Sequence, residues 1–406
     1  MDRPTDEELR RQTGVLSRGC ESLYTQQELE QRLKGAGEAG RQLRIKLGLD
    51  PTAPDIHLGH TVVLRKVRQF QDLGHRAVII IGDYTARIGD PSGANKTRPV
   101  LSPEEIDANA ATYVEQAGKV LDTSPDKLEI RRNSEWLEDL KLADLLKLAS
   151  QMTVARMMER DTFKKRLASD VPIGVHEFFY PLMQAYDSVC ISADVELGGN
   201  DQTFNNLVGR DIQRAHGQQP QIVMIMPILV GLDGVEKMSK SKGNYIGVTD
   251  EPNDMFGKVM SIPDALMGNY FALLTELPAQ QIDTLLDPAR THPRDAKAAL
   301  GKMIVERYHG ARAAGGAAAE FDRVFSQRNA PTDMPEIRAP GKSMNIVELI
   351  VLAGFAKSNS DARRLIAQGA VDIDGATISD AAATVELKGG SVLRVGKRRF
   401  GRIVPR

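Results

Sequence analysis

Residues 237–241, with the sequence Lys-Met-Ser-Lys-Ser, combine two lysines and two serines in one short segment. Glycines stand at 231, 234 and 243, and no apolar periodicity runs through the segment, so we expect a mobile surface loop. Its ammonium and hydroxyl donors suit a ligand with several negative oxygens, such as a polyphosphate. A solvated run of charge explains the composition equally well. The choice depends on whether the chain offers a site over which this loop can close.

Residues 57–60, His-Leu-Gly-His, form a second motif suited to anions. Apolar residues between 59 and 73 recur at helical spacing, so a helix is expected to begin near His57. A helix N-terminus presents free N–H groups and a positive dipole. His57 and His60 would donate hydrogen bonds to phosphate oxygens there, and Gly59 would let a ring or sugar approach the backbone. Two surface histidines are the plainer alternative, but the spacing favours a binding site. P-loop and dinucleotide signatures do not occur.

Tyr180, Gln184 and Asp187 are spaced to share one helix face. A phenol, an amide and a carboxylate on one face can line a small polar pocket, although a half-exposed helix side would show the same pattern. Paired glycines at 198–199 then end a predicted strand and allow close approach of a ligand, and Asp201 and Gln202 follow after Asn200.

A glycine-rich loop earlier in the chain offers Thr85 for a polar ligand group and Asp90 for an ammonium, although Asp-Pro-Ser-Gly is also an ordinary turn sequence.

One parallel sheet would bring these groups together. Apolar patterns predict strands at 43–48, 77–82, 189–197 and 222–227. The first two flank the helix that begins near His57 and form a βαβ unit. Each candidate group lies close to the end of one of these strands, and the carboxyl ends of parallel strands meet at one edge of a sheet. We therefore expect an α/β domain in which the groups converge on one cleft.

The chain is long enough for several domains. Residues 1–244 would form the catalytic domain, with a mostly helical insertion at 101–170 that carries a dimer interface. A helical domain is expected at 245–330, and a proline-rich linker at 331–342. Residues 343–406 would form a small module of two helices followed by short strands.

The C-terminal module differs from the whole chain in charge. From Lys342 onward there are 11 Lys and Arg against 6 Asp and Glu, a net charge of +5, whereas the whole chain is at −1. A local positive excess suits a phosphate backbone. Its residue pattern resembles an S4-type RNA-binding domain, which implies RNA contacts at Lys357, Arg363 and Arg364. A basic tail for solubility is the alternative.

Composition and cysteine spacing indicate the class of protein and its cellular compartment. The chain is 41% hydrophobic and 26% charged, which is ordinary for a soluble globular protein. Cys20 and Cys190 lie far apart without metal-ligand spacing, which predicts a reducing compartment. The longest apolar run, 222–230, is too short to span a membrane, and the acidic N-terminus lacks the features of a signal peptide. We therefore expect a cytoplasmic protein.

The motifs together resemble those of class I aminoacyl-tRNA synthetases. Residues 57–60 match the first family signature, usually His-Ile-Gly-His, and residues 237–241 match the second without departure. The segments 50–53, 180–187 and 198–202 resemble bacterial tyrosyl-tRNA synthetases in particular. The resemblance covers nearly the whole chain. It implies a Rossmann-like catalytic domain, a helical domain that helps to bind tRNA, and an S4-like domain.

That family activates tyrosine with ATP and then esterifies tRNA. The resemblance therefore implies L-tyrosine, ATP and tRNA(Tyr) as substrates, and a homodimer. The tyrosine carboxylate would attack the α-phosphate in line, so catalysis is positioning plus stabilisation of charge on the phosphates. No general base is needed, because the nucleophile is already ionised. The sequence shows no dedicated metal cage, and Mg²⁺ would arrive bound to ATP.

The resemblance also assigns roles residue by residue. Asp187 would hold the substrate phenol, and Gln202 would orient the substrate carboxylate. The tyrosine-binding set is Asp50, Asp90, Tyr180, Gln184, Asp187 and Gln202. The catalytic set around the phosphates is His57, His60, Lys237 and Lys240. The remaining ATP-binding set is Gly59, Thr85, Gly199, Asp201 and Ser241.

One position departs from many family members. They carry a tyrosine as a second phenol contact where this chain has Lys46, as in a subgroup of bacterial enzymes that it resembles. Asp187 is then the main discriminator for the hydroxyl. Enzymes of this family are an established example of selection through a hydrogen-bonded hydroxyl.

Two alternatives stay open. A tryptophan-specific synthetase shares both signatures, although Tyr180, Gln184, Asp187 and the S4-like tail argue against it. A non-catalytic RNA-binding protein on a synthetase scaffold is disfavoured by the intact histidines and lysines of both signatures.

Overall fold

The computed structural model describes residues 5–50, 56–91, 102–325, 331, 334–396 and 399–405. The chain divides into two compact units, Met1–Ala311 and Arg312–Arg406. Each unit is described by itself. In the described ranges, no helix is both long enough and apolar enough to cross a bilayer.

A six-stranded sheet forms the centre of the first unit. Its spatial order is β1-β6-β5-β2-β3-β4, with parallel pairing from β6 to β4 and an antiparallel β1 at one edge. The predicted α/β fold with a parallel sheet is therefore confirmed. The strands are β1 (Ser22–Tyr24), β2 (Arg44–Leu49), β3 (Arg76–Ile81), β4 (Leu128–Arg132), β5 (Val195–Gly199) and β6 (Ile222–Met226).

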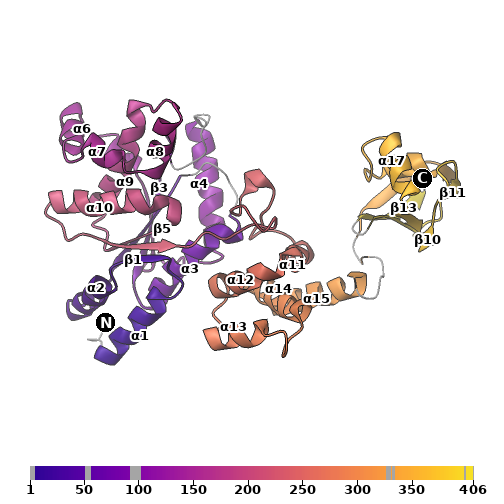
Figure 1. Cartoon of the computed structure of the whole chain (residues 1–406), viewed down its shortest axis with the longest axis horizontal. Coiled ribbons are helices and arrows are strands. Elements are labelled where there is room, and N and C mark those ends of the chain that lie inside the picture. The colour runs from indigo at the N-terminus through magenta and orange to yellow at the C-terminus, as the bar shows by residue number, and fades with distance from the viewer. Residues whose placement is uncertain are drawn as a thin grey trace. The chain divides into compact units, whose positions relative to one another are not determined.

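Helices connect the parallel strands and cover the sheet. The side chains of β3 and β6 are almost completely buried, as their continuous apolar sequences require in a parallel sheet covered on both faces. Helices α9 and α10 pack side by side (Figure 1). The connecting helices are α3 (Leu58–Asp72), α4 (Pro103–Ala117), α9 (Phe179–Cys190) and α10 (Thr203–Ala215).

Two sequence-based expectations in this unit are wrong in detail. The helical stretch 101–170 contains β4, which pairs in parallel with β3 and belongs to the sheet. Its sequence Leu-Glu-Ile-Arg-Arg carries charges because it is an edge strand, so its apolar signal is weak. The strand expected at 189–197 begins only at Val195, because α9 continues through Cys190 before a turn.

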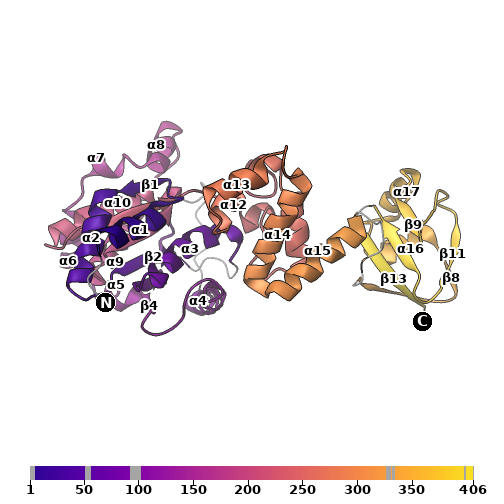
Figure 2. The same ribbon diagram turned by 90° about the horizontal axis from the view of Figure 1, so that it is seen from below.

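Shorter elements complete the first unit. Figure 2 shows α12, α13 and α14 packed side by side, and α12 also contacts α3 next to the sheet. At the N-terminus lie α1 (Asp6–Ser17) and α2 (Gln26–Glu38), and between β4 and α9 lie α5 (Ser134–Leu137), α6 (Leu142–Ala149), α7 (Val154–Met157) and α8 (Asp161–Ala168). The later helices are α11 (Pro252–Ser261), α12 (Met267–Leu274), α13 (Ala279–Leu286) and α14 (Pro293–His309).

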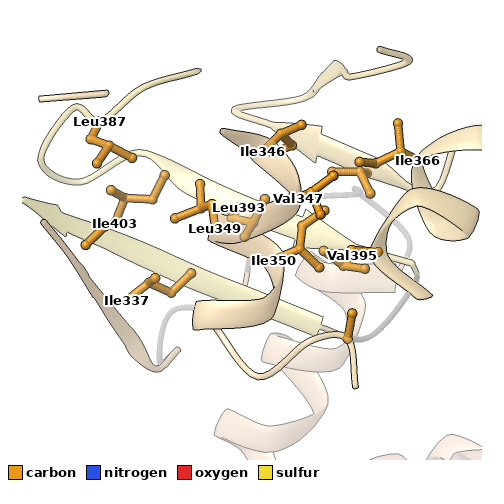
Figure 3. Close-up of a cluster of buried hydrophobic side chains, with 14 residues drawn as sticks. Ile337, Ile346, Val347, Leu349, Ile350, Ile366, Leu387, Leu393, Val395 and Ile403 are labelled. Carbon is orange, nitrogen blue, oxygen red and sulfur yellow. The ribbon is translucent and has the colours of Figure 1, made fainter. Parts of the chain in front are cut away.

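The second unit begins with α15 (Ala311–Phe325) and contains a small mixed domain. A five-stranded sheet, ordered β10-β9-β12-β13-β7, and a β11–β8 pair accompany two helices. Apolar side chains of α16 pack over β12 and β13 (Figure 3). The two helices predicted here are present as α16 (Ile346–Leu352) and α17 (Asn359–Ala367). The strands are β7 (Glu336–Ala339), β8 (Ser343–Asn345), β9 (Val371–Ile373), β10 (Ala376–Thr377), β11 (Thr384–Glu386), β12 (Val392–Val395) and β13 (Arg399–Pro405).

The linker expected at 331–342 is partly wrong. Strand β7 lies inside that stretch and pairs in parallel with β13. Its Ile337 and Ala339 are buried in the core of the small domain, so this part is structural despite the surrounding prolines. Residues 332 and 333 lie outside the described ranges.

Candidate active site

The His57–His60 motif forms the start of α3, as predicted. His57 is the N-cap, and its Nδ1 accepts a hydrogen bond from the Gly59 backbone N–H at 3.2 Å. His60 Nδ1 accepts from the His57 backbone N–H at 3.4 Å, and the two rings stack with centroids 3.8 Å apart. Because Nδ1 is the acceptor in each ring, a neutral imidazole carries its proton on Nε2. Both rings therefore retain an N–H donor for a ligand.

His57 is neutral at physiological pH. Burial lowers the pKa of His57 to about 3, and the nearby His60 and Lys237 act in the same direction. The ring is 7% exposed. His57 therefore acts as an uncharged hydrogen-bond donor rather than as a cation.

Glycine at position 59 is required by close packing. A Cβ there would lie 2.9 Å from His57 Cε1 and 3.5 Å from the Met238 Cβ. Met238 belongs to the lysine-rich loop and is only 4% exposed. The loop therefore packs against the helix start, which excludes the simple solvated charge run.

Asn244 holds the lysine-rich loop in shape. Its Oδ1 accepts from the Ser239 N–H at 2.8 Å, and its Nδ2 donates to Asp233 Oδ2 at 2.6 Å and to the Lys237 carbonyl at 3.1 Å. Gly231 packs so closely on Asn244 that a Cβ would lie 2.6 Å from the Asn244 carbonyl oxygen. The loop is thus a folded element with exposed lysines rather than an unstructured one.

Lys237 brings the loop to the turn after β5. Its Nζ lies 3.7 Å from Asp201 Oδ2, and both side chains are partly exposed. Asp201 lies two residues after Gly199, and a Cβ at Gly199 would lie 2.9 Å from the Asp201 Oδ1. Ser241 Oγ lies 2.9 Å from Ser239 Oγ on the same loop. The candidate phosphate site is therefore built from the start of α3, the end of β5 and the loop after β6.

A second cluster lies around Asp50 at the carboxyl end of β2. Tyr180 donates its hydroxyl to Asp50 Oδ2 at 2.8 Å, and Thr85 donates to Asp50 Oδ1 at 3.0 Å. Asn133 Nδ2 donates to Thr85 Oγ1 at 3.0 Å and lies 3.4 Å from Asp187 Oδ2. These bonds join three of the predicted tyrosine-binding residues. Thr85 is buried within this cluster.

A third cluster joins the remaining predicted tyrosine-binding residues. Gln202 Nε2 donates to Asp90 Oδ2 at 2.6 Å, and Arg160 pairs with Asp90 Oδ1 at 2.8 Å. Asn205 Nδ2 links Gln202 Oε1 at 3.1 Å to Gln184 Oε1 at 2.9 Å. Gln184 lies on α9 with Tyr180 and Asp187, so this helix contributes side chains to both clusters.

The carboxylate of Asp187 is buried, and its pKa is perturbed. It is 3% exposed, and Trp136 Nε1 donates to its Oδ1 at 2.8 Å. Burial raises the pKa of Asp187 to about 7, while Lys46, Trp136 and Asn133 oppose that rise. Perturbed carboxylates of this kind are typical of functional sites.

The comparisons with known proteins agree with this geometry. The family model "tRNA synthetases class I (W and Y)" matches residues 38–326, and "Tyrosine--tRNA ligase SYY-like C-terminal domain" matches residues 326–403. The chain is 52% identical to a tyrosine–tRNA ligase of Moorella thermoacetica, over 98% of this chain and 97% of the relative. It is 53% identical to a tyrosine–tRNA ligase of Ralstonia nicotianae, over 96% and 99% of the two chains.

The chain belongs to the tyrosine–tRNA ligase family.

Solved structures of this family share the fold. A crystal structure of tyrosyl-tRNA synthetase complexed with L-tyrosine, from Archaeoglobus fulgidus, superposes with a TM-score of 0.60 at 25% identity, covering 75% of this chain and 99% of that chain. A C-terminally truncated mitochondrial tyrosyl-tRNA synthetase of Aspergillus nidulans superposes with a TM-score of 0.62 at 22% identity, covering 78% and 94%.

The position at which this ligase departs from many family members lies inside the site. Lys46 is completely buried, and its Nζ contacts the Gln184 carbonyl at 2.7 Å, Ser188 Oγ at 2.7 Å and Glu196 Oε1 at 2.8 Å. An ammonium has three N–H donors, and these three acceptors use them all. Lys46 therefore anchors α9 to β2 through hydrogen bonds to Gln184 and Ser188, and it does not offer a donor to a substrate.

Several site residues were missed from the sequence. Asn133 and Trp136 follow the carboxyl end of β4, so recognising that edge strand would have pointed to them. Arg160 lies in the helical stretch and gave no local signal, because its partner Asp90 is distant in sequence. Asn205 lies near the start of α10, 3 residues after the predicted Gln202.

The predicted RNA contacts of this ligase lie in the second unit. Lys357, Arg363 and Arg364 are all exposed. Arg364 pairs with Asp361 at 2.6 Å. Arg363 lines an open pocket of about 610 Å³ together with Asn345, Val347, Glu348, Asn359, Asp380, Ala381 and Ala382.

Proposed function

We propose that this chain is a tyrosine–tRNA ligase that forms tyrosyl-adenylate from L-tyrosine and ATP and then esterifies tRNA(Tyr). The observation that carries the proposal is the buried Asp187 carboxylate on α9, the helix that also carries Tyr180 and Gln184. A buried acceptor that faces a ring-sized substrate distinguishes a phenol from a plain ring, because an unpaired carboxylate is costly.

The first step follows from the placement of charge. The tyrosine carboxylate attacks the α-phosphate and pyrophosphate leaves, so the protein must hold both reactants and stabilise negative charge. Lys237 and Lys240 supply ammonium groups on the loop, and His57 and His60 supply uncharged N–H donors. Gly59, Gly199, Asp201 and Ser241 complete the proposed nucleotide side.

We assign tyrosine binding to the cluster around Asp50 and to the cluster that joins Gln202, Asp90 and Gln184. Asp187 accepts from the phenol, Tyr180, Gln184 and Asp90 hold the ammonium, and Gln202 orients the carboxylate. Asp50 supports this side through Tyr180. The Thr85 hydroxyl is bonded to Asp50, so we assign it to holding that carboxylate instead of a phosphate.

The metal requirement is assigned to the nucleotide. Among the described residues there is no group of three His, Cys, Asp or Glu side chains placed to hold an ion. Mg²⁺ would be held by the phosphate oxygens of ATP, and it would supply charge neutralisation there. The lysine-rich loop and the histidines act on the same phosphates.

We assign the tRNA contacts and the dimer interface from exposed side chains, and the cellular location from composition. We assign tRNA contacts to residues 245–330 and to the C-terminal module, with Lys357, Arg363 and Arg364 on the latter. A homodimer through the α6–α8 region is supported by exposed apolar side chains there, namely Leu142, Leu146, Val154 and Leu167. We assign the domains to residues 1–244, 245–330 and 343–406, and we place the protein in the cytoplasm.

ATP–pyrophosphate exchange with each amino acid tests this function. Exchange with L-tyrosine supports it, and exchange with tryptophan but not tyrosine would establish the tryptophan-specific alternative. If the purified protein binds tRNA yet exchanges with no amino acid, the non-catalytic alternative is correct. Charging of tRNA(Tyr) with labelled tyrosine then tests the second step.

A further inference from the structure

The Asp187 carboxylate is held by two donors from the segment after β4. Trp136 Nε1 donates to Oδ1 at 2.8 Å, and Asn133 Nδ2 lies 3.4 Å from Oδ2. Asn133 also donates to Thr85 at 3.0 Å, so its amide is shared between two acceptors. Trp136 therefore makes the shorter bond to the carboxylate.

The Trp136 ring is itself held in place. One part of it packs against the buried cluster of Val78, Ile80, Ile191 and Ala193, on strands and turns of the sheet. The Arg131 guanidinium lies over the ring, 5.3 Å from its centroid, and pairs with Glu135 at 2.6 Å. A rigid ring with neighbours of this kind has little freedom to swing its N–H away from Asp187.

Lys46, whose charge acts on Asp187, does not point an N–H at the phenol position. The ammonium of Lys46 is bound by Gln184, Ser188 and Glu196. Among the described residues, Asp187 is the acceptor that we assign to the phenolic hydroxyl, and its orientation decides whether a lone pair points at the substrate. A group that orients this carboxylate therefore affects how well the site selects tyrosine over phenylalanine.

We propose that Trp136 is a positioning residue that sets the selection of tyrosine over phenylalanine, by holding Asp187 in the orientation that accepts the phenolic O–H. This inference rests on the proposed function. With tyrosine bound, the indole N–H and the phenol O–H donate to the same carboxylate. With phenylalanine bound, the carboxylate keeps the indole but lacks the ligand donor, and the buried acceptor is left incompletely paired.

The test compares kcat/KM of ATP–pyrophosphate exchange with tyrosine and with phenylalanine. Trp136→Phe removes the N–H and keeps a ring. The tyrosine-to-phenylalanine ratio of kcat/KM should fall about tenfold or more, mainly because kcat/KM for tyrosine falls. Trp136→His restores a ring N–H and should recover part of the ratio. Arg131→Met removes the charge over the ring but keeps an unbranched side chain there, the indole N–H and the packing of the ring against the sheet, so it should retain most of the wild-type ratio.

Two results would overturn the proposal. One is an active Trp136→Phe enzyme in which both kcat/KM values stay at the wild-type level, and the other is a fall of both values by the same factor, which marks a merely structural role; in either case the ratio is unchanged. Failure of wild-type exchange with every amino acid would instead contradict the proposed function, so the two failures are distinguishable.

A measurement on the unmodified protein does not depend on the folding of a variant. Trp136 is the only tryptophan in the chain, so selective excitation of tryptophan reports on this one indole. Saturating L-tyrosine should change its emission, because the ligand hydroxyl joins the same carboxylate. L-phenylalanine at equal occupancy should produce a smaller change. Identical responses to the two ligands would contradict the proposed link between Trp136 and the phenol.

Discussion

Replacement of Asp187 by asparagine should stabilise the fold while weakening selection for tyrosine. Burial raises the pKa of Asp187 from its ordinary 3.8 to about 7, in a side chain that is 3% exposed. The folded chain therefore holds the proton more tightly than the unfolded chain, and the ionised form opposes folding. Asparagine keeps an acceptor oxygen for Trp136 and carries no charge.

The magnitude follows from the difference between these pKa values. The change from 3.8 to about 7 corresponds to about 4 kcal/mol, at about 1.4 kcal/mol for each pH unit. Between these two values the folded state binds more protons than the unfolded state, so the contribution of Asp187 to stability falls as pH rises through this window. The asparagine variant lacks this contribution. Its stability relative to the unsubstituted protein should therefore rise by about 2 to 3 kcal/mol between about pH 5 and about pH 8.

The assay is urea unfolding of both proteins at the two pH values, followed by circular dichroism. ATP–pyrophosphate exchange in parallel should show at least about a tenfold loss of kcat/KM for tyrosine, with a much smaller loss for phenylalanine. A stability difference that is the same at both pH values would refute the assigned burial cost. An asparagine variant that still prefers tyrosine as strongly would refute Asp187 as the phenol acceptor.

Three further predictions concern the lysine-rich loop and the buried Lys46, which bonds to α9. Lys240→Ala should slow exchange far more than it weakens tyrosine binding, since its charge acts mainly on the transition state; equal losses would contradict that role. Gly231→Ala should slow exchange and cost about 1–3 kcal/mol of stability, because its Cβ would displace Asn244; unaltered exchange kinetics would show that the loop tolerates the change. Lys46→Met should lower the free energy of unfolding by about 3–5 kcal/mol, because Glu196 is left buried without its counter-ion, and adding Glu196→Leu should restore much of that loss in denaturant titrations.

Motifs defined by local spacing could be predicted from the sequence. The His57–His60 pair lies at a helix start because its capping groups and the apolar period are both local. Tyr180, Gln184 and Asp187 share one face because helical periodicity alone places them there. The strands at β2, β3 and β6 were also predictable, because buried parallel strands have continuous or alternating apolar sequences.

Elements with charged or interrupted sequences could not be predicted in this way. Strand β4 lies at the sheet edge and carries three charged residues, and β7 lies among prolines. From the sequence, β4 was expected to be part of a helical stretch and β7 part of a linker. Both strands are stabilised by pairing with a distant strand, β4 with β3 and β7 with β13, and local sequence does not reveal that pairing. With β4 unrecognised, Asn133 and Trp136 could not be associated with the site.

By itself, the sequence determined the kind of chemistry: two phosphate-binding motifs, and a helix face with a phenol, an amide and a carboxylate. The tertiary structure determined how those groups are held. Asp187 receives its donors from the end of β4, about fifty residues earlier in the chain, and Lys46 is occupied by Glu196 rather than facing a ligand. Burial and pairing between distant segments set the orientation and the charge of a side chain, and neither is encoded in local spacing.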